Sequence, residues 1–135
     1  MKPILLTTLS LLFVSANGFA QKKCEHCIEW DENRKLTWSD FRGKPNKISR
    51  NEALTDSGMS IGLECNEQTS EVTIECFFDP KKSWSKNEKS DYLLAHEQLH
   101  FDITELFVRK LRKQIDKLGD DCQKLNNYIE EYYNK

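Results

Sequence analysis

The 135-residue sequence lacks the compositions that mark non-globular chains. It has only 5 glycines and 3 prolines, and no internal repeat or low-complexity tract, which excludes collagen-like and linker-like chains. Neither sign of charge is in excess, because 20 Lys and Arg residues stand against 22 Asp and Glu residues and both signs are interspersed. Without a basic stripe, nothing points to nucleic acid or an anionic membrane as a partner. The composition predicts one compact domain.

Long apolar runs are also missing. The one apolar stretch, from Ile4 to Val14, is far shorter than the roughly 20 residues that a transmembrane helix needs. Lys2 precedes this stretch, and Gly18 and Ala20 place small residues at the −3 and −1 positions of a cleavage site. We interpret residues 1–20 as a secretory signal peptide and residues 21–135 as one exported domain, periplasmic or extracellular, without a stable membrane anchor.

Export determines how the cysteines are interpreted, because thiols that enter an oxidising compartment tend to form disulfides. Cys24 and Cys27 have the C-x-x-C spacing of a redox or zinc site, but no second pair follows at zinc-finger distance and no βαβ pattern surrounds them. A disulfide is therefore the favoured interpretation. We expect one or two disulfides, with Cys24 or Cys27 joined either to each other or to Cys122. The five cysteines are Cys24, Cys27, Cys65, Cys76 and Cys122.

The middle of the chain alternates between apolar and polar residues. Residues 59–65 and 72–78 both show a period of two and are joined by a short polar turn, which predicts a β-hairpin with one buried face. The expected register places Cys65 opposite Val72. Cys76 then lies roughly 13 Å further along the strand, so a Cys65–Cys76 disulfide is not expected.

Beyond the hairpin the apolar period becomes helical. Spacings of three and four predict one long helix over 92–118, capped at Ser85 or Ser90 and ended by Gly119. A second, shorter amphipathic helix is expected from Cys122 to the end. The predicted apolar face of the long helix comprises Tyr92, Ala95, Leu99, Ile103, Leu106, Phe107, Leu111, Ile115 and Leu118.

Upstream of the hairpin, the apolar segments 28–30 and 36–38 flank a polar turn and predict two short strands or extended segments. The capping-box spacing from Thr37 to Asp40, with Gly43 after it, predicts a single helical turn there. Strands followed by helices indicate an α+β domain. The expected architecture is a small antiparallel sheet, made of the hairpin and the N-terminal strands, followed by a long helix and a shorter C-terminal helix.

The long helix carries the sequence His96-Glu97-Gln98-Leu99-His100. At 100° per residue, His96 and His100 lie about 40° apart and one turn along the axis, so both imidazoles can meet one metal ion. Glu97 points about 80° off their midline, where it can take a proton from a water molecule rather than bind the metal. This H-E-x-x-H spacing predicts a Zn²⁺ site with His96 and His100 as ligands and Glu97 as the catalytic base.

The motif does not supply a third protein ligand. Asp102 and Glu105 lie about 140° and 160° from the histidine midline and cannot reach the metal, and Glu105 is expected to pair with Arg109. The site is then either a two-histidine site completed by water or a partner, or it takes a ligand from the N-terminal half. The candidates there are His26, Asp40, Glu52 and Asp56.

A second interpretation of the motif needs no metal. Ile103 and Phe107 lie within about 40° of the histidine direction, so the two histidines could be half-buried core residues on a shared apolar face.

Four segments of the sequence carry a resemblance to a known family: Leu36-Thr37-Trp38-Ser39-Asp40-Phe41-Arg42-Gly43, Ala53-Leu54-Thr55-Asp56-Ser57-Gly58, Ser83-Trp84, and the segment 93–105 around the histidines. They resemble the bacterial DUF922 family of predicted secreted zinc-dependent proteases, over about residues 28–112. The resemblance implies an exported, zincin-like metalloprotease domain with His96 and His100 as ligands and Glu97 as catalytic base.

The sequence therefore predicts an exported zinc-dependent metallopeptidase that hydrolyses peptide bonds in a peptide or protein substrate. The alternative is a non-catalytic, zincin-derived binding or structural module with an incomplete metal site. A third ligand near the histidines favours the enzyme, whereas its absence together with a salt-bridged, buried Glu97 favours the module.

Overall fold

The computed structural model describes residues 19–20, 24–67 and 69–134. The predicted signal peptide, residues 1–20, therefore lies outside the described residues except for Phe19–Ala20, which form the short strand β1.

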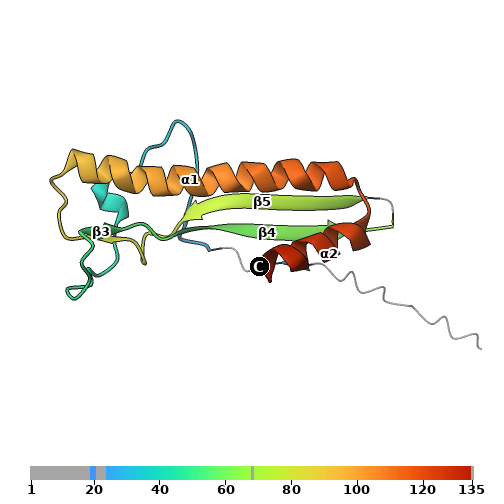
Figure 1. The fold of residues 1–135 in the computed structure, drawn as a ribbon, viewed down its shortest axis with the longest axis horizontal. Coiled ribbons are helices and arrows are strands. Elements are labelled where there is room, and N and C mark those ends of the chain that lie inside the picture. The colour runs from blue at the N-terminus through green and yellow to red at the C-terminus, as the bar shows by residue number, and fades with distance from the viewer. Residues whose placement is uncertain (1–18, 21–23, 68, 135) are drawn as a thin grey trace, which may run out of the picture.

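Two antiparallel strands, β4 (Ser57–Cys65) and β5 (Ser70–Phe78), form the centre of the main sheet. β1 pairs with the outer edge of β4, and β2 (Ile28–Glu29) pairs with the outer edge of β5, giving the order β1-β4-β5-β2. A second sheet of two residues per strand joins β3 (Ala53–Leu54) to β6 (Trp84–Ser85). With two helices added, this is the predicted α+β architecture (Figure 1).

The predicted hairpin is confirmed, but its register differs by two residues. Cys65 pairs with Ser70 rather than with Val72. The turn is tighter than expected because Asn66 and Thr69 close it: the Asn66 N–H donates to the Thr69 carbonyl, and the Thr69 N–H donates to Asn66 Oδ1. An even shift leaves every side chain on its predicted face.

Of the two N-terminal segments expected to be strands or extended chain, only the first forms a strand. The segment 36–38 is not a strand, because the Leu36 N–H donates to Gln98 Oε1 at 2.8 Å instead of to a neighbouring strand. The expected helical turn is confirmed as a single 3₁₀ turn, Trp38–Asp40, which is capped through Thr37.

The long helix α1 spans Asp91–Ile115. Ser90 is its N-cap and accepts a hydrogen bond from the Leu93 N–H at 3.1 Å, whereas the alternative cap, Ser85, is wrong because it lies in β6. A 3₁₀ turn of three residues prolongs the helix to Leu118.

The expected end of the long helix is confirmed at Gly119, whose φ of 71° lies in the left-handed region that favours glycine. The second helix, α2 (Cys122–Tyr133), follows as predicted. In Figure 1, α1 runs along β5 and α2 lies along β4, and side chains from both helices enter the core on the apolar face of the hairpin. That core includes Ile61, Leu63, Ile74, Phe78, Phe101, Val108, Leu111, Leu125 and Ile129.

The predicted apolar face of α1 is wrong from Tyr92 to Phe107. Leu99, Ile103, Leu106 and Phe107 are half exposed, and Tyr92 is 85% exposed. The helix instead buries a face that contains two carboxylates as well as apolar residues: Glu97, Phe101, Glu105, Val108, Leu111 and Ile115. A prediction from the spacing of apolar residues misses this face because it assumes that every Glu is exposed.

One of these buried carboxylates has cationic partners. Glu105 Oε1 accepts from Arg109 Nε at 2.8 Å, which confirms the expected pair, and from Arg112 Nη1 at 3.1 Å. The ion pairs offset the cost of burying the charge.

Two disulfides are present, Cys24–Cys27 and Cys65–Cys122. The first is one of the expected pairings; a bond from Cys24 or Cys27 to Cys122 is wrong, because Cys122 begins α2 beside the end of β4 and meets Cys65 there. Cys76 is buried and unbridged, so the disfavoured Cys65–Cys76 bond is indeed absent, and burial raises the pKa of the Cys76 thiol to about 12. Two disulfides are consistent with an exported protein.

No helix in the described part of the chain is long and apolar enough to cross a membrane.

Candidate metal centre

His96 and His100 lie one turn apart near the start of α1, and both are exposed. Their Nε2 atoms are 3.1 Å apart and their ring planes are inclined at 87°. Two imidazole nitrogens bound to a tetrahedral zinc ion at about 2.0–2.1 Å lie about 3.3 Å from each other. The histidine pair therefore fits one zinc ion with little movement, although the same distance also suits a hydrogen bond between the rings.

The interpretation of these histidines as half-buried core residues is wrong. Ile103 and Phe107, which were expected to share a buried face with them, are 50% and 52% exposed. The histidine face of α1 is therefore open to solvent.

Glu97 lies beside the pair but is turned inward. It is 3% exposed, and one of its carboxylate oxygens lies within 4.8 Å of a nitrogen of each histidine. Thr55 Oγ1, in the loop after β3, donates to Glu97 Oε2 at 2.7 Å and contacts the Glu97 carbonyl oxygen at 3.2 Å. The partner of this buried carboxylate is thus a neutral hydroxyl, not the cation of a salt bridge.

The sequence places His96, Glu97 and His100 together correctly, but it gives no signal for Thr55. Its contact with Glu97 spans 42 residues and depends on how β3 docks against α1, which no spacing in the sequence reveals.

These residues line an open cleft of about 360 Å³ between α1 and the strand β3. Its lining consists of Asn51, Glu52, Ala53, Leu54, Thr55, Leu93, His96, Glu97 and His100. A short edge strand and its flanks therefore form the wall opposite the histidines.

Of the four candidates for a third ligand, only Glu52 reaches this cleft. The Glu52 carboxylate is not grouped with the histidine nitrogens. Within the described residues, Glu97 is the one side chain whose ligand atom lies within 4.8 Å of ligand atoms of both His96 and His100.

The other three candidates do not converge with the histidines. His26 Nε2 lies 3.1 Å from Asp79 Oδ1, and Asp56 is not among the groups whose ligand atoms meet those of His96 and His100. Asp40 is buried, which acts to raise the pKa of its carboxyl, but hydrogen bonds from Thr37 and Arg34 and the Arg34 charge hold the pKa below its usual value. Within the described residues, none of these three groups is brought to the histidine pair.

Asp102 lies away from the histidines, as expected, because it accepts hydrogen bonds from Trp30 Nε1 and Gln98 Nε2, each at 2.8 Å.

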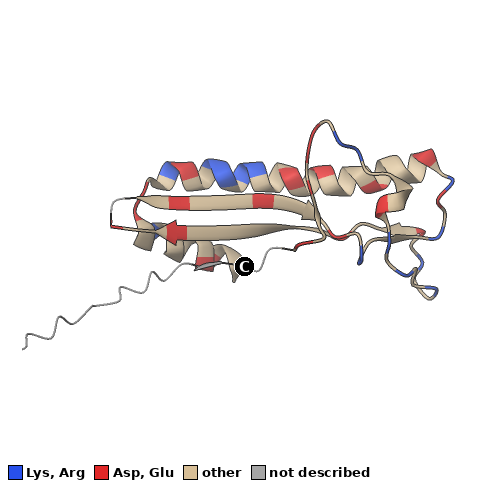
Figure 2. Cartoon of the chain, turned by 180° about the vertical axis from the view of Figure 1, so that it is seen from behind, with Lys and Arg blue, Asp and Glu red and all other residues tan. Residues whose placement is uncertain are grey.

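Charge along α1 is distributed unevenly. Figure 2 shows Asp and Glu in its N-terminal and middle parts and Lys and Arg towards its C-terminal end. This order suits the helix dipole, because acidic residues are favoured near a helix N-terminus and basic residues near its C-terminus.

No family model, curated protein or solved structure matches the chain. The resemblance to DUF922 therefore stays a prediction.

Proposed function

We propose that the protein is an exported zinc-dependent metallopeptidase, periplasmic or extracellular and related to the DUF922 family, which hydrolyses peptide bonds. One observation carries the proposal: the Nε2 atoms of His96 and His100 converge at 3.1 Å in an open cleft with the Glu97 carboxylate beside them. Two imidazole ligands with a carboxylate beside them that can act as a base is the arrangement that H-E-x-x-H zinc hydrolases use.

The roles follow from the chemistry of each group. His96 and His100 would hold Zn²⁺, which when bound supplies a Lewis acid that polarises a carbonyl and activates water. Glu97 accepts a proton from the attacking water at a carboxylate oxygen and passes it to the leaving amine. Thr55 is a positioning residue, because its hydrogen bond fixes the orientation of the Glu97 carboxylate.

The cleft also suits an extended peptide. In the described part of the chain β3 pairs with β6 along one side only, so its other edge has backbone groups available for an added strand. A peptide bound along β3 lies opposite α1, with a peptide bond facing the histidines.

A non-catalytic module is the second candidate, and a specific observation favours it. Within the described residues no third side chain other than Glu97 converges with the histidine pair, and Glu97 is almost fully buried. Such a module binds a metal or a peptide at the cleft without hydrolysis.

The variant Glu97→Gln distinguishes the metallopeptidase from the non-catalytic module. The amide keeps the size of the side chain and an oxygen that can accept from Thr55, but it is not a base, so the enzyme should retain zinc and lose about 10²- to 10⁴-fold in rate. His100→Ala should lose both zinc and activity. Glu88→Gln, at an exposed position before α1, is the matched control and should change neither.

The measurement is hydrolysis of a denatured protein and a peptide library, with zinc content determined in parallel. If wild-type protein holds a full equivalent of zinc but cleaves no substrate that Glu97→Gln leaves intact, the protein is the non-catalytic module instead.

A further inference from the structure

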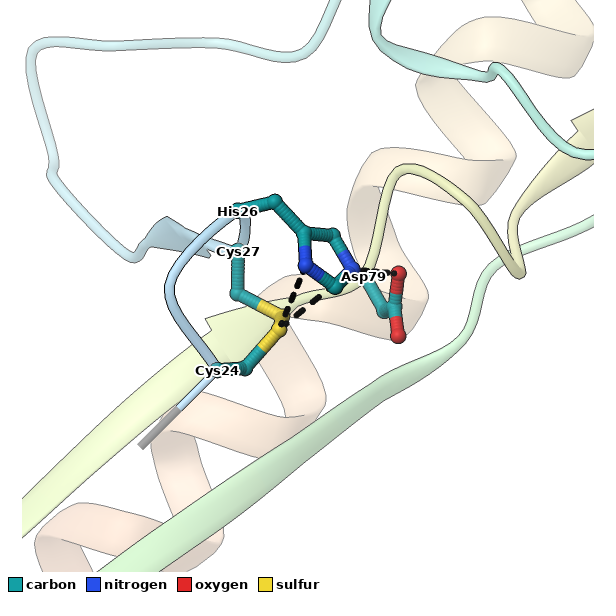
Figure 3. Close-up of side chains that lie close together, drawn as sticks. All are labelled: Cys24, His26, Cys27 and Asp79. Atoms are coloured by element: carbon teal, nitrogen blue, oxygen red, sulfur yellow. Dashed lines mark hydrogen bonds and ion pairs between the residues drawn. A yellow bond between two sulfur atoms is a disulfide. The ribbon is translucent and has the colours of Figure 1, made fainter. Parts of the chain in front are cut away.

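A second cluster of reactive side chains lies where β2 pairs with the end of β5, and none of them lines the cleft (Figure 3). Cys24 and Cys27 form a disulfide across a turn in which the Cys27 N–H donates to the Cys24 carbonyl at 3.2 Å. β2 begins directly after this turn, and its residue Ile28 pairs with Phe78 at the end of β5. That pairing brings Asp79, the next residue after β5, beside the disulfide.

Asp79 is a fixed anion. It is 4% exposed, and its Oδ1 accepts from His26 Nε2 at 3.1 Å and from the Lys81 N–H at 2.9 Å, while Lys82 Nζ lies 3.6 Å from Oδ2. Burial acts to raise the pKa of Asp79, but the hydrogen bonds from Lys81 and His26 and the charges of His26 and Lys82 hold the pKa below its usual value. Asp79 is therefore ionised at neutral pH and orients the imidazole of His26.

The same imidazole contacts a sulfur atom. His26 Nδ1 and Nε2 lie 3.7 and 3.6 Å from Cys24 Sγ. Because Nε2 is bonded to Asp79, Nδ1 is the nitrogen that can exchange a proton with the sulfur. The His26 side chain is 39% exposed and Cys24 is half-buried, so a thiol from solution can reach the disulfide.

We propose that Cys24–Cys27 is a thiol–disulfide exchange site, in which His26 is the acid–base group at Cys24 and Asp79 is its positioning residue. The substrate class is a pair of thiols in a reduced protein or peptide. The proposal is independent of the metal centre, since none of its four residues lines the cleft at α1.

The contact with His26 determines which sulfur atom is attacked and which one leaves. A substrate thiolate attacks Cys27 Sγ, the Cys24–Cys27 bond breaks, and Cys24 Sγ leaves with the electron pair while His26 gives it a proton or a hydrogen bond. The second substrate thiolate then attacks the substrate's own sulfur in the mixed disulfide and releases Cys27. In total the substrate dithiol loses two electrons and becomes a disulfide, and Cys24 and Cys27 become thiols.

The other disulfide is a control within the same molecule. Cys65–Cys122 joins the end of β4 to the start of α2, and none of the three histidines of the chain lies at this bond: His26 contacts Cys24 and Asp79, and the other two are on α1 beside β3. It should exchange slowly and at a rate that changes at His26 leave unaltered.

The test uses the full chain, produced in an exporting host and purified without reductant. Limiting glutathione is added, thiols are trapped with N-ethylmaleimide at successive times, and peptide mass mapping gives the state of each cysteine. We expect Cys24–Cys27 to open at least ten times faster than Cys65–Cys122, with glutathione attached to Cys27 rather than to Cys24.

His26→Gln and Asp79→Asn should slow the opening of Cys24–Cys27 on the order of ten-fold, since the leaving thiolate loses its stabilising partner. His26→Gln should also abolish the preference of glutathione for Cys27, which a purely structural role of His26 does not predict. Glu25→Asp, in the same turn with its charge kept, is the matched control and should behave as wild type.

An unchanged rate of opening of Cys65–Cys122 in every variant shows that the fold is intact. Equal rates at Cys24–Cys27 in wild type and His26→Gln, or glutathione found mainly on Cys24, would overturn the proposal.

Discussion

Two clusters in this molecule combine imidazole with a buried carboxylate, and we propose different chemistry for each. The first, on α1, combines His96 and His100 with Glu97; the second combines His26 with Asp79 and the sulfurs of Cys24–Cys27. In both, a carboxylate at most 4% exposed lies beside exposed imidazole. The difference lies in the bonds that the carboxylate and the other donors already make.

In the first cluster the carboxylate is bonded to Thr55, so both imidazoles are left to share a ligand. In the second the carboxylate is bonded to the imidazole, and the sulfurs are bonded to each other and are not available as metal ligands. A set of metal-binding residue types therefore indicates a metal site only after hydrogen bonds and disulfides have been assigned. The following variants test that distinction, beginning with the largest expected effect.

Zinc content should depend on the cluster at α1 and not on the cluster at Cys24–Cys27. Wild type should bind one Zn²⁺ per chain, and His96→Ala or His100→Ala should reduce this to below about a tenth of an equivalent, because one imidazole cannot hold the ion. His26→Gln should keep the full equivalent. Elemental analysis after zinc addition and gel filtration is the measurement.

Glu52→Gln refines the same experiment, because Glu52 is the candidate that lines the cleft with the histidines. A weaker zinc affinity in this variant identifies it as the third ligand. Zinc absent from wild type, or lost in His26→Gln, would contradict the assignment of the metal to α1.

Removal of each disulfide should distinguish a structural bond from a reactive one. Cys65–Cys122 spans 57 residues of sequence and Cys24–Cys27 spans 3. Loop-closure entropy then gives a loss of unfolding free energy of about 4 kcal/mol for Cys65→Ser with Cys122→Ser, and about 2 kcal/mol for Cys24→Ser with Cys27→Ser. Urea unfolding checks both values, and a larger loss for the shorter loop would show that the C-x-x-C bond is the main structural one.

The sequence predicts the elements of this fold well because local rules govern them. The alternation in the hairpin, the Ser90 cap and Gly119 each act within a few residues, and each was sufficient to place its element. The buried face of α1 was not predictable in this way. Glu97 and Glu105 enter the core because Thr55, Arg109 and Arg112 satisfy them, and the Thr55 hydroxyl comes from a loop 42 residues away in the sequence.

The candidate sites show the same difference between contacts that local geometry determines and contacts that depend on long-range packing. His96, Glu97 and His100 are four residues apart or fewer, so helical geometry alone brings them together. Asp79 lies 53 residues from His26, and the two meet only because β2 pairs with the end of β5. A C-x-x-C spacing without that pairing gave no reason to prefer exchange chemistry.

The smallest expected effect compares the two carboxylates directly. Asp79→Asn replaces a charged acceptor that holds His26 and the Lys81 N–H, and should cost on the order of 1 kcal/mol of unfolding free energy at pH 7. Glu97→Gln keeps an oxygen that can accept from the neutral Thr55 hydroxyl, and should cost less. Urea unfolding at pH 7 compares the two, and an equal or larger loss for Glu97→Gln would contradict the contrast drawn between the clusters.

Acid should sharpen this comparison, because the pKa of Asp79 is lower in the folded protein than its ordinary value of 3.8. A lowered pKa means that the unfolded chain takes up the proton first as the pH falls, so the stability that Asp79 contributes is present above about pH 4 and is lost as the pH falls through the folded-state pKa. Asp79→Asn has no such proton to take up. The loss of stability between pH 5 and pH 3 should therefore be smaller in this variant than in wild type, and an unchanged loss would mean that Asp79 is not held as an anion by His26 and its neighbours.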